Sequence, residues 1–187
     1  MVADNQNQGI ATNEKSCKLI TEENVLKVLR RDIGPDAIFK SFNVEDFTAK
    51  GDNFSSFVTS IEIKYTVKGN AVSSKYVAKI NPKRFSSDTD LFIHTQFEQE
   101  NKFYSKIIPE MNEILEANHQ APIRVPKFYH YSDEAGSEIL YLEDMRERGF
   151  KLYDRLKGVD EVHAELVFKE LGRLHCAGKL LIERYGE

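Results

Sequence analysis

Three polar features of the sequence have residue types that suit phosphate binding. The first is a loop between two apolar stretches, in which a glycine and small polar residues leave backbone N–H groups free to face phosphate oxygens. Its residues are Gly51, Asp52, Asn53, Phe54, Ser55 and Ser56. A glycine followed by Asp-Asn more often forms a plain hairpin turn, so this loop predicts a phosphate site only together with other residues.

Lys79 is the second feature. Apolar residues flank it on both sides (Val77, Ala78 and Ile80), which predicts a short strand whose lysine points to one definite face. A point charge on a long stem can reach phosphate oxygens that the backbone cannot. The alternative interpretation is an edge-strand lysine that discourages aggregation.

Glu100, which follows Lys79 by 21 residues, is the third feature. It lies in a stretch of helical spacing, where a carboxylate could pair with Lys79 and hold it extended toward a nucleotide. Glu98 is two residues away and would face elsewhere on a helix, so it competes poorly for this role. The alternative is that both glutamates are simply solvated.

The surrounding segments predict an α+β fold. Alternating or apolar runs indicate strands at about residues 42–47, 57–67, 75–80, 127–132 and 138–143. Helical spacing indicates a helix capped by Thr21, a long helix over about 90–117 that Pro109 should kink, and a final helix capped by Asp160. The order of three strands, a helix and two strands is that of the N-terminal lobe of a protein kinase.

Composition and charge exclude several classes of protein. The net charge of -4 gives no global attraction for nucleic acid or anionic lipid. No run of 18 apolar residues and no secretory signal is present, so a cytoplasmic protein without a membrane span is expected. The two cysteines lie far apart and match no zinc spacing, so no metal site is expected from them. Residues 1–18 are polar and predict a disordered tail.

Six strings, taken in order, resemble the ecdysteroid kinase-like family, also called CHK-kinase-like, which is abundant in insects. They are GDNFSSF, YVAKI, FEQENKFYSKIIPEM, ILYLEDMRERGF, YDRLKGVD and ELGRLHCAG. The resemblance runs from about residue 20 to about residue 182. It implies a protein-kinase-like fold close to choline and aminoglycoside kinases. Residues 19–143 would form the N-lobe, with a five-stranded antiparallel sheet and a long helix, and 144–187 the hinge and the first helix of the C-lobe.

The resemblance also implies roles for single residues. Gly51 to Ser56 would form the phosphate loop of an ATP site, and Glu100 would be the ion-pair partner of the phosphate-binding Lys79. Backbone groups around Glu143 and Met145 would bind adenine. Asp144 is interpreted as a structural cap or hinge anchor, and His175 as a structural residue.

A kinase of this class also needs a catalytic aspartate, and the sequence contains no His-x-Asp string that could supply it. We therefore expect a truncated, inactive form of an ATP-dependent kinase for a small hydroxyl compound, such as an ecdysteroid or a xenobiotic alcohol. Magnesium would be needed only in the full-length enzyme. The alternative is a non-catalytic module that binds a nucleotide or a partner. The apolar stripe of the last helix would be exposed and could support self-association.

Overall fold

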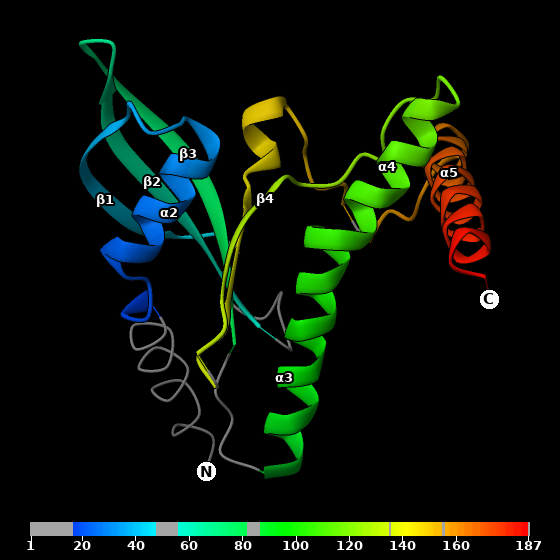
Figure 1. Ribbon diagram of the computed structural model, residues 1–187, viewed down its shortest axis with the longest axis horizontal. Helices are drawn as coiled ribbons and strands as arrows, with labels where there is room; N and C mark the ends of the chain where they lie inside the picture. The colour runs from blue at the N-terminus through cyan, green and yellow to red at the C-terminus, as the bar shows by residue number, and fades with distance from the viewer. Residues whose placement is uncertain (1–16, 48–55, 82–86, 135, 155, 187) are drawn as a thin grey trace.

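A computed structural model describes residues 17–47, 56–81, 87–134, 136–154 and 156–186. It contains a five-stranded sheet in the order β1-β2-β3-β5-β4, in which all neighbours are antiparallel, and which lies on the side of the molecule away from α5 (Figure 1). The strands are β1 (Ile38–Asp46), β2 (Phe57–Val67), β3 (Asn70–Ile80), β4 (Phe128–Ser132) and β5 (Ile139–Glu143). The predicted α+β fold, with this sheet and a long helix, is confirmed. The predicted tail lies mostly outside the described residues.

The β2–β3 hairpin is longer than the sequence predicted. Lys68 and Gly69 both have positive φ angles, of 50° and 81°, and Val67 pairs with Asn70. Two successive positive φ angles are typical of a two-residue turn whose twist matches that of the flanking strands. The ladder therefore begins directly after the turn. β3 starts at Asn70 instead of residue 75, and the strand that carries Lys79 is not short.

The helix α2 (Glu22–Asp32) covers one face of the sheet. Thr21 is its N-cap and accepts a hydrogen bond from the N–H of Asn24 at 3.3 Å, so the predicted cap is confirmed. Alternate strand residues pack beneath α2 to form the main core, because side chains of a strand point to opposite faces in turn. Its largest fully buried members include Leu29, Ile61, Ile63, Tyr76, Ile80 and Tyr141.

The predicted long helix consists of three segments. They are α3 (Ser87–Lys102), a π-helical segment η1 (Phe103–Ile107) and α4 (Ile108–Ala117). Pro109 lies in the first turn of α4. The irregularity falls just before the proline, in η1, because Pro109 has no N–H for the carbonyl of Ser105 and its ring crowds that carbonyl.

The short 3-10 helix η2 (Met145–Arg148) follows β5, and α5 (Glu161–Tyr185) closes the described part of the chain. Asp160 caps α5 and accepts a hydrogen bond from the N–H of His163 at 2.9 Å, as predicted. α5 lies beside α4, away from the sheet (Figure 1). Within the described ranges, no helix has both the length and the apolar character needed to cross a membrane.

Candidate nucleotide site

Lys79 lies on the face of the sheet opposite α2. Its neighbours Ala78 and Ile80 are fully buried in the main core, so the alternation of the strand turns Lys79 the other way. Lys79 is in the middle of the sheet, where it faces Val58 of β2 and Leu140 of β5 in the registers of the two ladders. The alternative of an edge-strand lysine therefore does not hold.

Glu100 of α3 forms a direct ion pair with Lys79, from its Oε2 to the lysine Nζ. Both side chains are 26% exposed, which leaves the pair half-shielded from water. The Lys79 ammonium also lies 5.6 Å from the centre of the Phe97 ring, within range of a cation–π contact. The pair holds the lysine extended between the sheet and α3.

Glu98 has a different partner. Its Oε1 lies 3.8 Å from Nε2 of His94, one turn earlier on the same helix. Glu98 is therefore not directed at Lys79, which agrees with its position two residues from Glu100.

An open cavity of about 540 Å³ borders the Lys79–Glu100 pair. Its other lining residues come from α3 and η1, and they are Gln96, Phe97, Gln99, Phe103 and Ile107. The cavity combines a paired cation with amide and aromatic side chains. A ligand there would meet the Lys79 ammonium, which has more than one N–H to donate.

The bend after β5, from Glu143 to Met145, is the predicted adenine site. Its distance from Lys79 along the sheet can be compared with the distance between the adenine and the phosphates of a nucleotide. Glu143 pairs with Tyr76 and Leu140 pairs with Lys79, so three residues of strand separate the two places. That separation is about 10 Å. The backbone N–H of Glu143 is already donated to the carbonyl of Lys127 at 2.9 Å, so it is not free for adenine without a local rearrangement. Met145 begins η2.

Asp144 is almost fully buried at this bend and caps η2. Its carboxylate accepts hydrogen bonds from the backbone N–H, Nε and Nη2 of Arg146. Burial raises the pKa of Asp144, but these bonds and the Arg146 charge outweigh it and hold the pKa below its ordinary value. The interpretation of Asp144 as a cap agrees with this geometry.

Arg146 was not singled out from the sequence. Besides pairing with Asp144, Arg146 donates a hydrogen bond from Nη2 to Oγ of Ser60 at 3.2 Å, and its guanidinium carbon lies 4.1 Å from the centre of the Phe47 ring. It therefore ties the bend after β5 to β2 and to the end of β1. A single arginine gives no sequence signal for such a link, because the contacts join residues far apart in the chain.

The predicted phosphate loop is described only at its last residue. Gly51, Asp52, Asn53, Phe54 and Ser55 lie outside the described residues. Ser56 is buried directly before β2, two residues from Val58, which pairs with Lys79. His175 is exposed on α5, remote in sequence from these groups.

A second polar cluster was also missed by the sequence analysis. Glu138, directly before β5, is 0% exposed, and its carboxylate contacts Asn81 Nδ2 at 2.6 Å and His94 Nδ1 at 2.6 Å. The N–H of Gly136 also donates to it at 3.0 Å. Glutamate is usually a surface residue, so its position in the sequence did not distinguish it.

No grouping of three or more His, Cys, Asp or Glu side chains suited to a metal ion occurs in the described part of the chain. The magnesium that a kinase uses therefore has no fitting set of ligands among these residues.

Comparison with protein families gives one match. The model of the ecdysteroid kinase-like family matches residues 50–187, which is well over half of the chain and includes Lys79, Glu100 and the bend after β5. Searches of curated proteins and of solved structures returned no match.

Proposed function

The chain belongs to the ecdysteroid kinase-like family, and we propose that it binds ATP between the sheet and α3. Membership implies a kinase-like phosphotransferase. In the proposed complex the Lys79 ammonium contacts the α- and β-phosphates, and the adenine lies toward Glu143 and Met145. The loop from Gly51 to Ser56 would cover the phosphates.

The ion pair between Lys79 and Glu100 is the observation that carries this proposal. A lysine in the middle of a sheet is costly to keep without a partner, and its position beside an open cavity leaves its remaining N–H groups for a ligand. Phosphate oxygens suit such a charge, because charge-assisted hydrogen bonds are roughly twice as strong as neutral ones.

For the acceptor, we propose a small compound with a hydroxyl group, such as an ecdysteroid or a xenobiotic alcohol. The bound nucleotide would supply the phosphoryl group. No step is assigned to a metal ion, because the described residues do not fit one. We expect no ATP turnover by the 187-residue polypeptide, since its sequence lacks a His-x-Asp string for the catalytic base. The proposal for this chain therefore concerns nucleotide binding.

The test is ATP binding by the wild-type chain and by Lys79→Ala, measured by thermal shift and by calorimetry. We expect ATP to raise the melting temperature of the wild type. Lys79→Ala should lose at least about tenfold in affinity, because a charge-assisted bond contributes about 1.5–3 kcal/mol.

Lys64→Ala is the matched control. Lys64 is an exposed lysine of β2 whose nearest carboxylate, Glu62, is 3.9 Å away. Its removal changes the net charge equally but should leave ATP affinity unchanged. Equal affinity for ATP in Lys79→Ala and in the wild type, or no binding by the wild type, would refute the proposal.

A further inference from the structure

The α3 helix is fastened to the sheet at two polar points. One is the ion pair of Glu100 with Lys79 of β3. The other is the cluster of His94 on α3, Glu138 before β5 and Asn81 directly after β3, which we call the Glu138 clamp. Lys79 and Asn81 are two residues apart on one strand end, and His94 and Glu100 are six residues apart on one helix. Both contacts therefore join α3 to the sheet, and they lie about 9 Å apart along α3.

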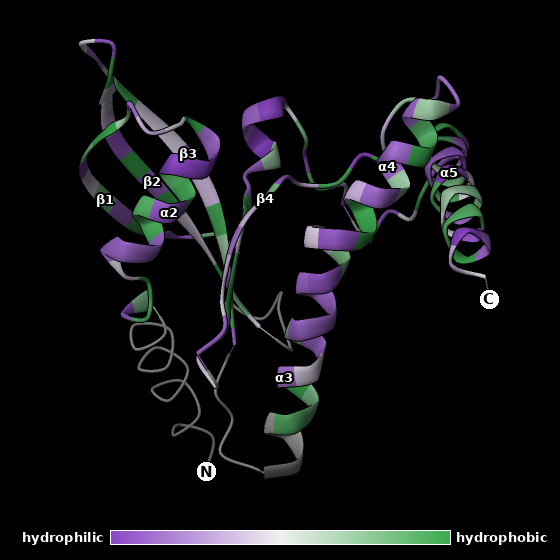
Figure 2. Cartoon of the chain, viewed as in Figure 1, coloured by the Kyte–Doolittle hydropathy of each residue, from purple (hydrophilic) through white to green (hydrophobic). Residues whose placement is uncertain are grey.

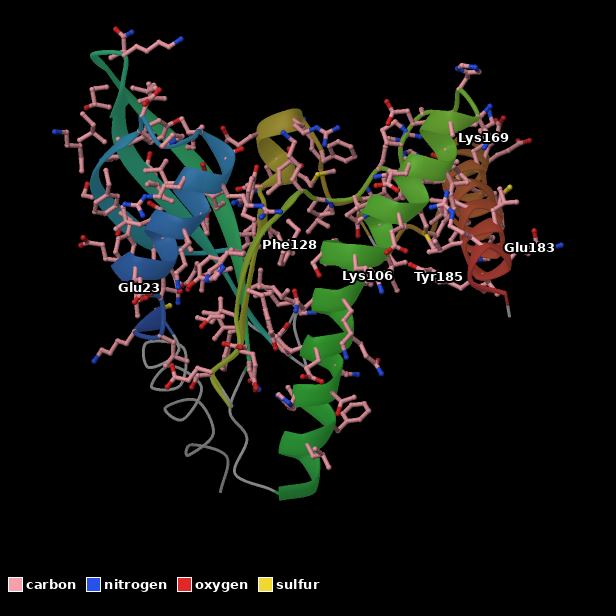
Figure 3. The ribbon with its side chains drawn as sticks, viewed as in Figure 1. Glu23, Lys106, Phe128, Lys169, Glu183 and Tyr185 are labelled. Carbon is pink, nitrogen blue, oxygen red and sulfur yellow. The ribbon has the colours of Figure 1, made fainter. Side chains whose placement is uncertain are left out.

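Few apolar contacts hold α3 in this place. Ile93 and Phe97 are buried against Leu140, with Phe128 and Tyr131 packed beside them. Phe128, labelled in Figure 3, lies between the sheet and α3. Figure 2 shows mostly hydrophilic residues along α3, and a helix with so small an apolar face relies on polar contacts for its orientation.

In the Glu138 clamp, His94 donates a hydrogen bond to the Glu138 carboxylate. Burial raises the pKa of Glu138, but hydrogen bonds from Asn81, His94 and the backbone outweigh it and hold the pKa below the ordinary value. An ionised carboxylate accepts only, so the Nδ1 of His94 must carry the proton that lies between them. The backbone N–H of Asn81 also donates to the Glu138 carbonyl at 2.9 Å, which fixes Asn81 relative to β5. His94 is thus anchored to a carboxylate that the sheet itself holds rigidly.

Glu100 depends on that anchor for its direction. Ile93, Phe97 and Glu100 recur at i, i+4 and i+7, so they lie on the face of α3 that meets the sheet. A rotation of α3 that breaks the contact of His94 with Glu138 also turns Glu100 away from Lys79. We propose that the Glu138 clamp is a positioning device that sets α3 so that Glu100 can hold Lys79 extended toward phosphate. Its effect on nucleotide affinity rests on the proposed function, whereas its effect on Lys79 does not.

The first test needs no nucleotide. Reaction of Lys79 with an amine-selective reagent is followed by peptide mass spectrometry, with exposed Lys64 as the internal reference. Pairing with Glu100 should slow the reaction, because the ion pair shields the Lys79 amine from the reagent. We expect His94→Leu to raise Lys79 reactivity several-fold, to the level of Glu100→Gln. His94→Asn, whose amide N–H can take the place of the Nδ1 donor, should restore the wild-type value.

The second test is a double-mutant cycle on ligand affinity. His94→Leu should weaken ATP binding about as much as Glu100→Gln does, and should add little in the Glu100→Gln background, because both act through Lys79. Affinity for adenosine, which has no phosphate, should not change in His94→Leu. A merely structural role would weaken both ligands and would not be rescued by His94→Asn.

The outcomes separate the two proposals. If the wild type binds no ATP but His94→Leu still exposes Lys79, the proposed function fails and the positioning device stands. If Lys79 reactivity is the same in the wild type and His94→Leu, the positioning device is refuted, whatever the nucleotide results. Glu138→Gln is a second variant, used if it folds. His94 is the safer site for substitution, because its side chain is 38% exposed and its replacement should disturb folding less than replacement of buried Glu138.

Discussion

The sheet and the α5 helix differ in how they bury their apolar residues. Beneath α2, the sheet encloses a continuous core in which the largest side chains are less than 2% exposed. α5 buries only Ala177 and Leu181, against α4. Its exposed apolar residues are Val162, Leu166, Val167, Phe168, Leu171, Leu180, Ile182 and Tyr185. Hydrophobic residues recur along α5 in Figure 2 without the cover that the sheet has.

Polar contacts partly take the place of a core at the far end of α5. The hydroxyl of Tyr185 donates to Glu110 at 2.8 Å, and the Lys106 ammonium lies 5.7 Å from its ring centre. Figure 3 labels Lys106 and Tyr185 at this junction of η1, α4 and α5. Closer to the start of α5, Glu170 accepts from both Arg124 and Arg173. Such exposed contacts contribute little to stability, so the sheet and not α5 should determine the stability of the chain.

The largest expected effect tests that difference directly. Ile61→Ala removes a side chain that is 1% exposed and should cost about 2–5 kcal/mol of unfolding free energy, from lost burial and the cavity left behind. Phe168→Ala, at a side chain 71% exposed, should change it by less than about 0.5 kcal/mol. Denaturant unfolding of both variants is the measurement. Similar costs at the two positions would show that the exposed face of α5 is covered in solution.

The next largest effect on stability is expected at the buried carboxylate of Glu138. Glu138→Gln should cost about 1–3 kcal/mol at neutral pH, because its amide cannot accept from the same three donors. The folded-state pKa of Glu138 is lowered, so its contribution is present above the ordinary value of 4.5 and is lost as pH falls through the folded pKa. The stability difference between wild type and variant should therefore shrink on acidification below about pH 4.5. A difference that does not depend on pH would contradict an ionised Glu138.

Two glycines of α5 allow a finer measurement. A Cβ at Gly172 would meet no atom within 4 Å, whereas one at Gly178 would lie 3.1 Å from Cε of Met111. Gly172→Ala should stabilise the chain by about 1 kcal/mol through helix propensity. Gly178→Ala should gain less, since the flexible Met111 must move. Thermal unfolding of the two variants shows which is stabilised more. An equal gain would mean that Met111 leaves enough room for a methyl group at Gly178 without moving.

The smallest effect on stability concerns the exposed residues of α5. We expect the chain to self-associate through them, and Leu166→Ser with Phe168→Ser should reduce association while changing unfolding free energy little. Sedimentation velocity over a range of concentrations is the measurement. Wild-type chain that stays monomeric at high concentration would contradict this expectation.

The sequence by itself determined the type and order of most elements, because local signals are sufficient for them. Thr21 and Asp160 mark helix starts through the cap they provide, and the alternation from Phe57 to Val67 matches β2 at both ends. The start of β3 and the π-helical segment were missed. Each depends on how a turn or a proline is accommodated by its neighbours, which periodicity does not report.

For the candidate site, residue types and spacing singled out Lys79 and Glu100 as a possible ion pair, and the structure pairs them. Their roles in an ATP site remain a prediction from the family resemblance. Only the tertiary structure brought Glu138, His94 and Asn81 together, and only it joined Arg146 to Ser60 and Phe47. These contacts join residues between 44 and 99 positions apart, and no residue among them stands out in the sequence by its type. The burial of Glu138 and the long-range contacts of His94 and Arg146 are decided by tertiary packing and not by local sequence.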